Sequence, residues 1–156
     1  ELKSRGLGDV YKRQGWVRSI GVSNYGKHHL EDMLNYARIM PSVNQIEINP
    51  WLQRPSLISA TIESGAVPMA YSPLARGHKV RDPSLVQIAN ILGCTPAQVA
   101  IKWCIDSGAI TIPKSSNHDR ILENFHSQNI DITPVMEQLQ SMDENYVSGW
   151  DPTVEI

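Results

Sequence analysis

Short β-like runs and helix-period segments alternate along most of this chain, and this alternation limits the possible folds more than any other feature. Parallel strands need a long crossover between them, whereas antiparallel strands can be joined by a tight turn. Each β-like run here is followed by enough residues for a crossover helix. The pattern therefore predicts an α/β fold with a parallel sheet. The predicted strands are residues 16–22, 42–48, 66–71 and 109–113.

Helix signals fall between and after these strands. Asp82 supplies an N-cap directly before a proline. Thr95 and Gln98 have the spacing of a capping box. Asn117 can cap a helix over residues 118–128, which follows the last strand. The helices thus have their own start signals, independent of the strand pattern.

Two architectures fit a parallel α/β chain, an open doubly wound sheet and an eight-stranded barrel. The doubly wound fold favours a glycine-rich turn after the first strand, but Gly21 and Gly26 do not form G-x-G-x-x-G. A complete barrel needs about 250 residues. With 156 residues the chain has room for half of one.

The two ends of the chain differ in character from its middle. Residues 1–14 are basic and lack periodicity, and SRGLGDVYKRQ resembles a translated sequencing-adapter read that recurs at the ends of assembled reading frames. We expect residues 1–14 to be a non-native leader, the alternative being a genuine basic tail or linker. The half barrel is then expected over residues 15–146, followed by a C-terminal tail over 147–156.

Composition excludes several classes of function. The formal net charge of −2 provides no basic field for a nucleic-acid partner. No run approaches the about 18 apolar residues of a membrane span, and no signal-like segment opens the chain, so we expect a cytoplasmic protein without a membrane partner. Cys94 and Cys104 are too few and wrongly spaced for a metal site or a disulfide framework.

Polar residues gather where the predicted strands end. Ser23 and Asn24 follow the first strand, Gln45 lies in the second, Tyr71 ends the third, and residues 114–117 follow the fourth. A barrel builds its site at the carboxyl ends of several strands. Strand ends are also polar simply because the backbone leaves the core there. Because polar residues occur at the ends of all four predicted strands, a functional site at this end of the sheet is favoured.

The helix after the fourth strand has the features of an anion site. Arg120, Glu123 and Asn124 share one face, and Leu122 and Phe125 lie on the opposite one. A lysine and two serines precede the helix, whose N-terminus favours negative charge. An arginine can hold a phosphate with two parallel hydrogen bonds. The alternative is a solvated helix face with a capped start.

Several motifs together resemble the carboxyl half of the aldo-keto reductases, which are NADPH-dependent (β/α)8-barrel carbonyl reductases. The resemblance covers residues 15 to about 145, in order and at consistent spacing. It implies half of a (β/α)8 TIM barrel, containing parallel strands five to eight with their helices. The motifs are GVSNY (21–25), NQIEINP (44–50), AYSPLARG (70–77), TPAQVAIKW (95–103) and IPKSSNHDRILENF (112–125).

The resemblance also implies an NADPH/NADP site and the role of each matching residue. The residues expected at the nicotinamide carboxamide are Ser23, Asn24 and Gln45, with the ring of Tyr71 stacked on the nicotinamide. The residues expected near the pyrophosphate are Ser72 and Leu74, covered by a loop over 75–81. The residues expected at the phosphate on the adenosine ribose are Lys114, Ser115, Ser116, Asn117 and Arg120. The residues expected at the adenine are Glu123 and Asn124.

The catalytic residues of such a reductase, a Tyr, Lys, Asp and His, come from the amino half of the barrel, so none is expected in this chain. The alternative is that Tyr71 donates the proton, with its pKa lowered by Lys114 on a neighbouring strand end. Trp51 and Trp150 are candidates for walls of the substrate pocket. We expect a carbonyl reductase whose partner is a small carbonyl substrate, or else a non-catalytic or regulatory NADP(H)-binding protein. As a half barrel, the chain is expected to self-associate through its open edges.

Overall fold

The computed structural model describes residues 7–155. Within the predicted leader, residues 1–6 lie outside the described part, and helix α1 covers Leu7–Arg13. The native or non-native origin of residues 1–14 therefore stays a prediction.

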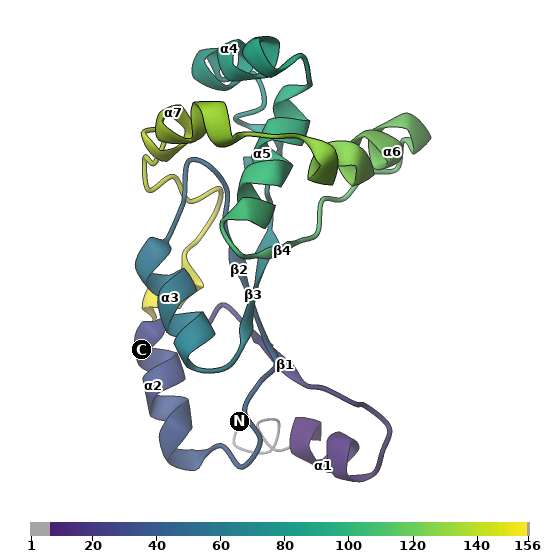
Figure 1. Ribbon diagram of the computed structural model, residues 1–156. Coiled ribbons are helices and arrows are strands. Elements are labelled where there is room, and N and C mark those ends of the chain that lie inside the picture. Colours follow the sequence, from purple (N-terminus) through teal and green to yellow (C-terminus); the bar gives the residue numbers. More distant parts are fainter. Residues whose placement is uncertain (1–6, 156) are drawn as a thin grey trace.

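The centre of the fold is a parallel sheet of four strands in the order β1-β2-β3-β4, which confirms the predicted α/β class (Figure 1). In the register, Gly21 pairs with Val43, which pairs with Val67. Met69 pairs with Ile110 on the far side. The strands are β1 (Gly21–Ser23), β2 (Val43–Glu47), β3 (Val67–Tyr71) and β4 (Ile110–Thr111).

The first strand is shorter than the sequence predicted. Residues 16–22 were expected to be extended and paired, but only Gly21–Ser23 form β1. The ladder to β2 begins where Ser42 N–H donates to the Ile20 carbonyl at 2.7 Å. Trp16 lies before that point, is 73% exposed and stacks on Tyr11. The β-like alternation of residues 16–20 therefore describes an exposed lead-in segment rather than a strand.

The crossover helices lie along one face of the sheet, and the other face is open (Figure 1). The α-helices after α1 are α2 (Lys27–Tyr36), α3 (Pro55–Glu63), α4 (Pro83–Leu92), α5 (Pro96–Asp106), α6 (His118–His126) and α7 (Met136–Gln140). Short 3-10 turns cover Ala75–Gly77, Ser127–Asn129, Thr133–Val135 and Pro152–Val154. No single helix among residues 7–155 is long and apolar enough to cross a membrane, although α4 and α5, bent by 87°, meet that criterion as a pair.

The predicted caps start three of these helices. The Asp82 carboxylate accepts from the backbone N–H of Ser84 at 2.9 Å and of Leu85 at 3.2 Å. Thr95 and Gln98 form the reciprocal capping box. The side-chain oxygen of Asn117 accepts from the first turn of α6 at 3.0 Å.

Removing the cap of α4 is expected to lower the free energy of unfolding. Asp82→Ala leaves two first-turn N–H groups without their carboxylate partner and should cost about 1 kcal/mol. Asp82→Asn keeps an acceptor oxygen and is the matched control, with a loss of a few tenths of a kcal/mol at about neutral pH. Urea unfolding followed by circular dichroism measures both. An unchanged free energy of unfolding in Asp82→Ala would show that α4 does not depend on this cap.

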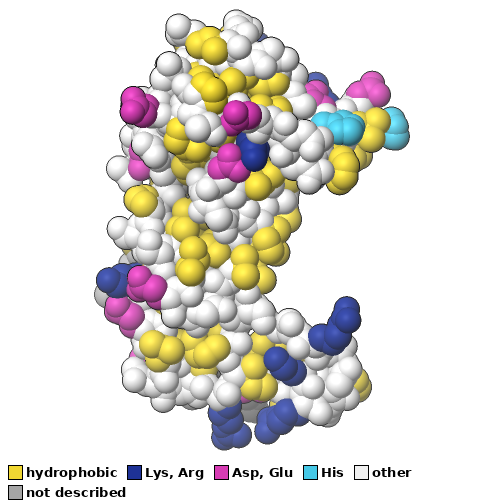
Figure 2. Space-filling view, viewed as in Figure 1, with side chains coloured by type: hydrophobic (Ala, Val, Ile, Leu, Met, Phe, Trp, Pro, Cys, Tyr) yellow, Lys and Arg dark blue, Asp and Glu magenta, His cyan; other side chains and the backbone are white. Residues whose placement is uncertain are grey.

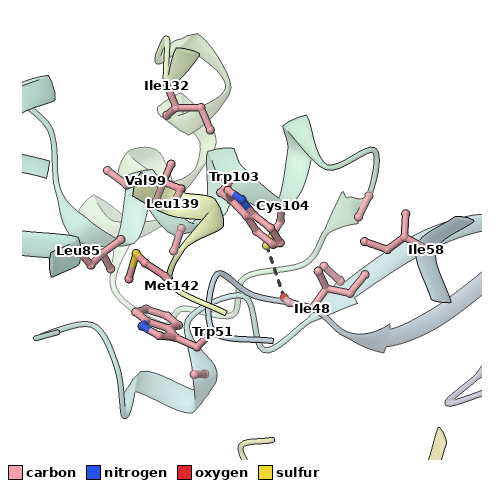
Figure 3. Close-up of a cluster of buried hydrophobic side chains, with 14 of the residues drawn as sticks. Ile48, Trp51, Ile58, Leu85, Val99, Trp103, Cys104, Ile132, Leu139 and Met142 are labelled. Atoms are coloured by element: carbon pink, nitrogen blue, oxygen red, sulfur yellow. Dashed lines mark hydrogen bonds between the residues drawn. The ribbon is translucent and has the colours of Figure 1, made fainter. Parts of the chain in front are cut away.

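The main core lies between the sheet and its helices (Figure 3). Ile46 and Ile48 point from β2 and the residues after it into this layer and are 0% exposed. Trp51 is also 0% exposed and packs in the same cluster as Leu85 and Met142. The expectation that Trp51 lines a substrate pocket is therefore wrong, because the chain after β2 turns inward and buries the indole.

The opposite face of the sheet is concave and open to solvent in the described residues. Val67, Ile110 and Ile112 lie on it and are 42%, 45% and 42% exposed. Figure 2 shows the hollow on the right, with apolar side chains along its wall. A curved sheet with helices on its outer face and an apolar inner face has the form of a barrel segment.

Candidate functional site

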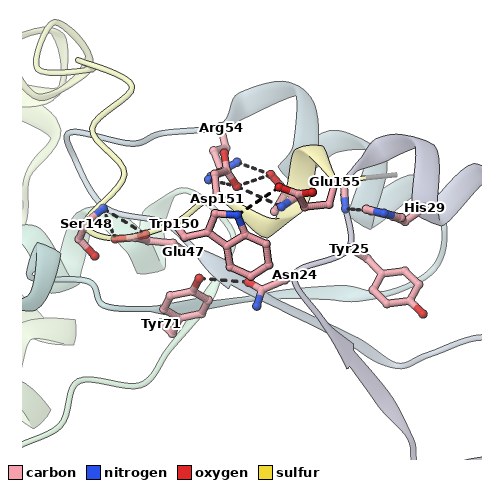
Figure 4. A network of polar contacts seen from close by, with 12 residues as sticks. Asn24, Tyr25, His29, Glu47, Arg54, Tyr71, Ser148, Trp150, Asp151 and Glu155 are labelled. Carbon is pink, nitrogen blue, oxygen red and sulfur yellow. Dashed lines mark hydrogen bonds and ion pairs between the residues drawn. The ribbon is translucent and has the colours of Figure 1, made fainter. Parts of the chain in front are cut away.

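Asn24 and Tyr71 join strands that are not neighbours, since β2 lies between β1 and β3. The Tyr71 hydroxyl donates to the side-chain oxygen of Asn24 at 3.0 Å (Figure 4). Asn24 has a left-handed backbone with φ 62°, which asparagine tolerates better than most residues. Its N–H donates to the Gln45 carbonyl at 2.8 Å. These contacts gather the first three strand ends at one edge of the sheet.

Ser23 and Gln45 line the inner face beside this pair. The Ser23 hydroxyl donates to the Gln45 carbonyl at 2.9 Å, so it is held by the backbone of β2. The Gln45 amide nitrogen lies 3.3 Å from the sulfur of Met69. A thioether is a weak acceptor, so a better acceptor can displace it. The Gln45 side chain is therefore free to bind an amide or carbonyl group at the strand ends.

The environment of Tyr71 argues against its use as an activated proton donor. Burial, followed by the negative charge of Glu47, raises the pKa of the phenol above its usual value, and Arg54 and Arg76 offset this only in part. Lys114 is not among the groups that act on it. The alternative of a Tyr71 and Lys114 pair with a lowered pKa is thus wrong. A neutral phenol suits ring stacking and hydrogen-bond donation.

The segment after β3 concentrates unusual backbone geometry. Ser72, Ala75 and Arg76 have φ values of 49°, 46° and 54°. For non-glycine residues this left-handed region costs roughly 1–2 kcal/mol each. Such strain is found preferentially at ligand clamps and switch regions. Leu74 packs against the core between these residues and anchors the loop.

The segment between β4 and α6 presents cationic side chains at a helix start. Ser115 accepts from the backbone N–H of Asn117 at 3.1 Å, and Asn117 in turn caps α6, so both fix the turn. The Lys114 ammonium and the Arg120 guanidinium have no hydrogen bond or ion pair to the described residues. Ser116 lies within the same turn. The structure thus places two cationic side chains without a described partner before and after a turn that Ser115 and Asn117 hold in place.

Glu123 does not share the open environment of Arg120. Its carboxylate accepts from the Thr95 hydroxyl at 2.6 Å, and its carbonyl accepts from the Gln98 amide at 3.2 Å. Glu123 therefore links α6 to the start of α5 through these hydrogen bonds. Its neighbour Asn124 lines a groove between α5 and α6. Glu123 and Asn124 were both expected at the adenine, because their positions on the helix do not show which neighbouring element each side chain faces.

The apolar face predicted for α6 is only partly covered. Leu122 is 46% exposed and Phe125 is 65% exposed. No residue of α6 is buried in the described part of the chain. The helix is amphipathic as predicted, but its apolar side borders the open edge of the sheet rather than the core.

The C-terminal tail reaches the same edge of the sheet, which the sequence did not predict (Figure 4). Ser148 N–H donates to both carboxylate oxygens of Glu47, at 3.2 and 3.3 Å, and Glu47 is 2% exposed. Arg54 pairs with Asp151 at 2.9 Å and donates to the Thr153 hydroxyl at 2.7 Å. The charges of Glu47 and Asp151 both raise the pKa of Tyr71, so the attached tail affects the electrostatics of the strand ends.

The ionisation of Asp151 contributes to this attachment. Burial alone would raise the pKa of Asp151, but hydrogen bonds from Arg54 and Thr153 outweigh burial and hold the pKa below its usual value. A lowered folded-state pKa gives stability that is complete above the unfolded value of about 3.9 and is lost as the pH falls through the folded value. The tail should therefore be held firmly at neutral pH.

Arg54→Ala is expected to lower the free energy of unfolding at neutral pH by about 1–3 kcal/mol, because a charged hydrogen-bonded pair is lost. The loss should shrink as the pH falls below the unfolded value of about 3.9, because Asp151 is protonated first in the unfolded chain and then, at its lowered pKa, in the folded parent. Urea unfolding at pH 7 and pH 3 measures this difference. Lys102→Ala is the control, since Lys102 and Asp106 pair at 2.7 Å on α5 and such surface pairs contribute about 0–1 kcal/mol. Equal losses at both pH values would contradict the role of Asp151.

A comparison with protein families places most of the chain in one of them. The sequence model described as the Aldo/keto reductase family matches residues 9–146. This range includes the strand ends, the loop after β3 and the start of α6.

Relatives with curated sequences match along nearly the whole chain. An uncharacterized oxidoreductase of Bacillus subtilis, YtbE, is 38% identical over 149 residues, which are 95% of this chain and 53% of the relative. Aldose reductase B of Dictyostelium discoideum is 40% identical over 134 residues, which are 84% of this chain and 43% of the relative. The chain thus spans about half the length of the relatives it matches.

Solved structures give the same picture. An aldo-keto reductase from a Medee basin deep-sea metagenome library superposes with a TM-score of 0.86 at 28% identity, covering 95% of this chain and 57% of that protein. A Bombyx mori aldo-keto reductase in complex with NADP has a TM-score of 0.79 at 30% identity, covering 90% of this chain and 49% of that protein. The four parallel strands are therefore half of a (β/α)8 barrel, as predicted.

Proposed function

Because this chain belongs to the aldo/keto reductase family, we propose that it forms the NADPH-binding half of a carbonyl-reducing barrel. The observation that carries the proposal is that Lys114, just before α6, and Arg120, in its first turn, have no hydrogen bond or ion pair from their charged groups to residues 7–155. A helix N-terminus attracts negative charge, and a cationic side chain near it that has no carboxylate partner adds to this attraction. Such an arrangement favours an anionic ligand.

A phosphate fits this end of the site. Arg120 can hold it through two parallel hydrogen bonds, and Lys114 adds a second positive charge. Ser115 and Asn117 keep the turn in place through their own hydrogen bonds, so the cations are presented from a fixed segment. Recognition of an extra phosphate on the adenosine ribose distinguishes NADPH from NADH. The solved Bombyx mori relative holds NADP, which supports this choice.

A carboxamide fits the other end. The Tyr71 hydroxyl donates to the side-chain oxygen of Asn24. The N–H groups of the same amide are then available to a ligand carbonyl. Within residues 7–155 the Gln45 side-chain amide donates only to the weakly accepting sulfur of Met69, and a ligand can replace this contact. Nicotinamide, when bound, supplies a hydride to the carbonyl carbon of a substrate. These residues would orient one face of the ring toward that substrate, while Tyr71 packs against the other.

The other half of the barrel would supply the proton donor, and both halves would line the substrate pocket. We place the Tyr, Lys, Asp and His that protonate and orient the carbonyl in the half of the barrel that this chain does not contain. Trp150 is 68% exposed, and its indole N–H donates to Glu155, which suits a wall of the carbonyl pocket. Cys94 and Cys104 are free thiols, in keeping with the cytoplasmic location that we propose.

A completed barrel tests the proposal. Residues 15–156 are joined to the part of the Bacillus subtilis relative that they do not match. The binding of NADPH to this chimeric protein is measured by calorimetry. We expect NADPH to bind and to support reduction of a simple aldehyde. Absence of binding would overturn the proposal. Turnover would show only that this half can serve a catalytic barrel, because the half expected to hold the proton donor comes from the Bacillus subtilis relative.

A further inference from the structure

The segment over residues 143–149, which leads from α7 into the C-terminal tail, is fixed to the core. The backbone N–H groups of Glu144 and Tyr146 both donate to the Trp51 carbonyl, at 3.1 and 2.9 Å. Trp51 is 0% exposed, so this acceptor belongs to the core itself. Further along, Ser148 N–H donates to the buried carboxylate that ends β2 (Figure 4). The segment is therefore a fixed support beside the strand ends.

The loop over residues 75–81 makes its side-chain contacts with this support. The Lys79 ammonium pairs with the Glu144 carboxylate at 2.6 Å and lies 4.9 Å from the centre of the Tyr146 ring. The His78 Nδ1 and the Tyr146 hydroxyl share a hydrogen bond at 3.0 Å. In the described part of the chain, no other hydrogen bond or ion pair is made by a side chain of the loop. Because the core holds both partners, these contacts restrict the loop.

The backbone of the loop does not favour its conformation by itself. Ala75 and Arg76 have φ values of 46° and 54°, in the left-handed region that non-glycine residues avoid. Ala75 is 0% exposed and anchors the start of the loop, whereas Arg76 and His78 are exposed. Strained positions persist only where the surroundings determine them. The contacts to Glu144 and Tyr146 supply this constraint for the exposed part of the loop.

The loop presents a cation without a partner near the strand ends. The Arg76 guanidinium has no hydrogen bond or ion pair to residues 7–155. It lies over Gly149, where a Cβ would come within 3.0 Å of the Nη2 atom of Arg76. Burial raises the pKa of Tyr71, and the positive charge of Arg76 is among the charges that oppose this rise. The guanidinium is therefore near the end of β3 and available to an anion.

We propose that Glu144 and Tyr146 are positioning residues that hold the loop over residues 75–81 so that the Arg76 guanidinium binds the pyrophosphate of the nucleotide. The inference rests on the proposed function for the presence of a nucleotide at the strand ends. A guanidinium can hold phosphate oxygens through two parallel hydrogen bonds. A loop that is already ordered loses less conformational entropy when its ligand binds. Glu144 and Tyr146 thus raise the affinity without touching the ligand.

Hydrogen exchange of the full chain tests the support without any nucleotide. Glu144→Ala combined with Tyr146→Phe removes the ion pair and the hydroxyl contact but keeps the ring. We expect the amides of residues 75–81 to exchange about two- to tenfold faster, because a hydrogen bond and a partly exposed ion pair are lost. Asp106→Ala removes an ion pair of similar length on α5 and should leave these amides unchanged. Unchanged exchange in the double variant would overturn the proposal.

A charge exchange separates positioning of the loop from simple packing. Lys79→Glu and Glu144→Lys each place like charges together and should make the loop exchange faster. The variant with both substitutions restores an opposite pair, so it should recover most of the protection. Circular dichroism confirms that each variant is folded. If the double substitution exchanges as fast as the faster single one, the pair does not position the loop.

Nucleotide affinity in the completed barrel tests the link to Arg76. We expect Arg76→Ala to bind NADPH about 10- to 100-fold more weakly, because charged hydrogen bonds are lost. The double variant at Glu144 and Tyr146 should lose about two- to tenfold when Arg76 is present. In the Arg76→Ala background the same two substitutions should cost less than about twofold, since they act through that side chain. Equal losses in both backgrounds would contradict the proposal.

Adenosine 2′-monophosphate is the control ligand, because it has no pyrophosphate. Its affinity should be the same in the unmodified barrel and in all these variants. If it and NADPH both bind but the variants leave the NADPH affinity unchanged, the proposed function stands and this inference is overturned. If neither binds the unmodified barrel, the proposed function fails and this inference fails with it.

Discussion

Replacing Arg120 with alanine in the completed barrel is expected to weaken NADPH binding by about 10- to 100-fold, because charged hydrogen bonds contribute about 1.5–3 kcal/mol. The affinity for NADH should change by less than about threefold, since NADH lacks the phosphate that Arg120 would hold. The guanidinium has no partner among the described residues, so its removal breaks no protein contact there. Calorimetric titration with both nucleotides measures the two losses.

Two variants sharpen this experiment. Arg38→Ala removes an exposed arginine elsewhere on the surface, away from the strand ends, and should leave both affinities unchanged. Arg120→Lys keeps the charge but loses the two-pronged geometry and should give an intermediate loss of NADPH affinity. If NADH and NADPH lose affinity equally in Arg120→Ala, Arg120 does not bind the ribose phosphate.

Trp51→Ala is expected to lower the free energy of unfolding by about 3–5 kcal/mol, because truncation leaves a large cavity in the core. Trp51 is 0% exposed. Its indole N–H has no hydrogen-bond partner among residues 7–155, so the expected loss is one of packing. The Trp51 carbonyl accepts from Glu144 and Tyr146 at 3.1 and 2.9 Å, and these backbone contacts can persist in the variant.

Trp150→Ala is the matched control, since this indole is 68% exposed. Its removal should change the free energy of unfolding by about 0.5 kcal/mol or less. Denaturant unfolding of the full chain at one protein concentration provides both values. Similar losses for the two tryptophans would contradict the assignment of Trp51 to the core.

Local signals explain why the fold could be predicted from the sequence. The caps at Asp82, Thr95 and Asn117 use neighbours within three residues, so the pattern contains all the information they need. The first strand was overestimated because pairing requires a partner, and β2 contacts only its last part. Alternation shows that a segment can be a strand, whereas a neighbouring strand determines how much of it becomes one.

The site was partly predictable for the same reason. Asn24 and Tyr71 were expected near each other because parallel strands end at one edge, and the structure joins them at 3.0 Å. The contact between Glu47 and Ser148 spans 101 residues and leaves no local trace in the sequence. Glu123 has a helical position like that of a ligand-binding residue, and only the neighbouring α5 shows that its carboxylate is engaged.

The ratio of the NADH and NADPH dissociation constants of the completed barrel shows directly whether this half of the barrel recognises the phosphate on the adenosine ribose. Calorimetry at one fixed salt concentration gives both constants for the unmodified site of this chain. We expect NADPH to bind about 10- to 100-fold more tightly, through charged contacts of Lys114 and Arg120 with the additional phosphate. Equal affinities, or no binding of either nucleotide, would contradict it.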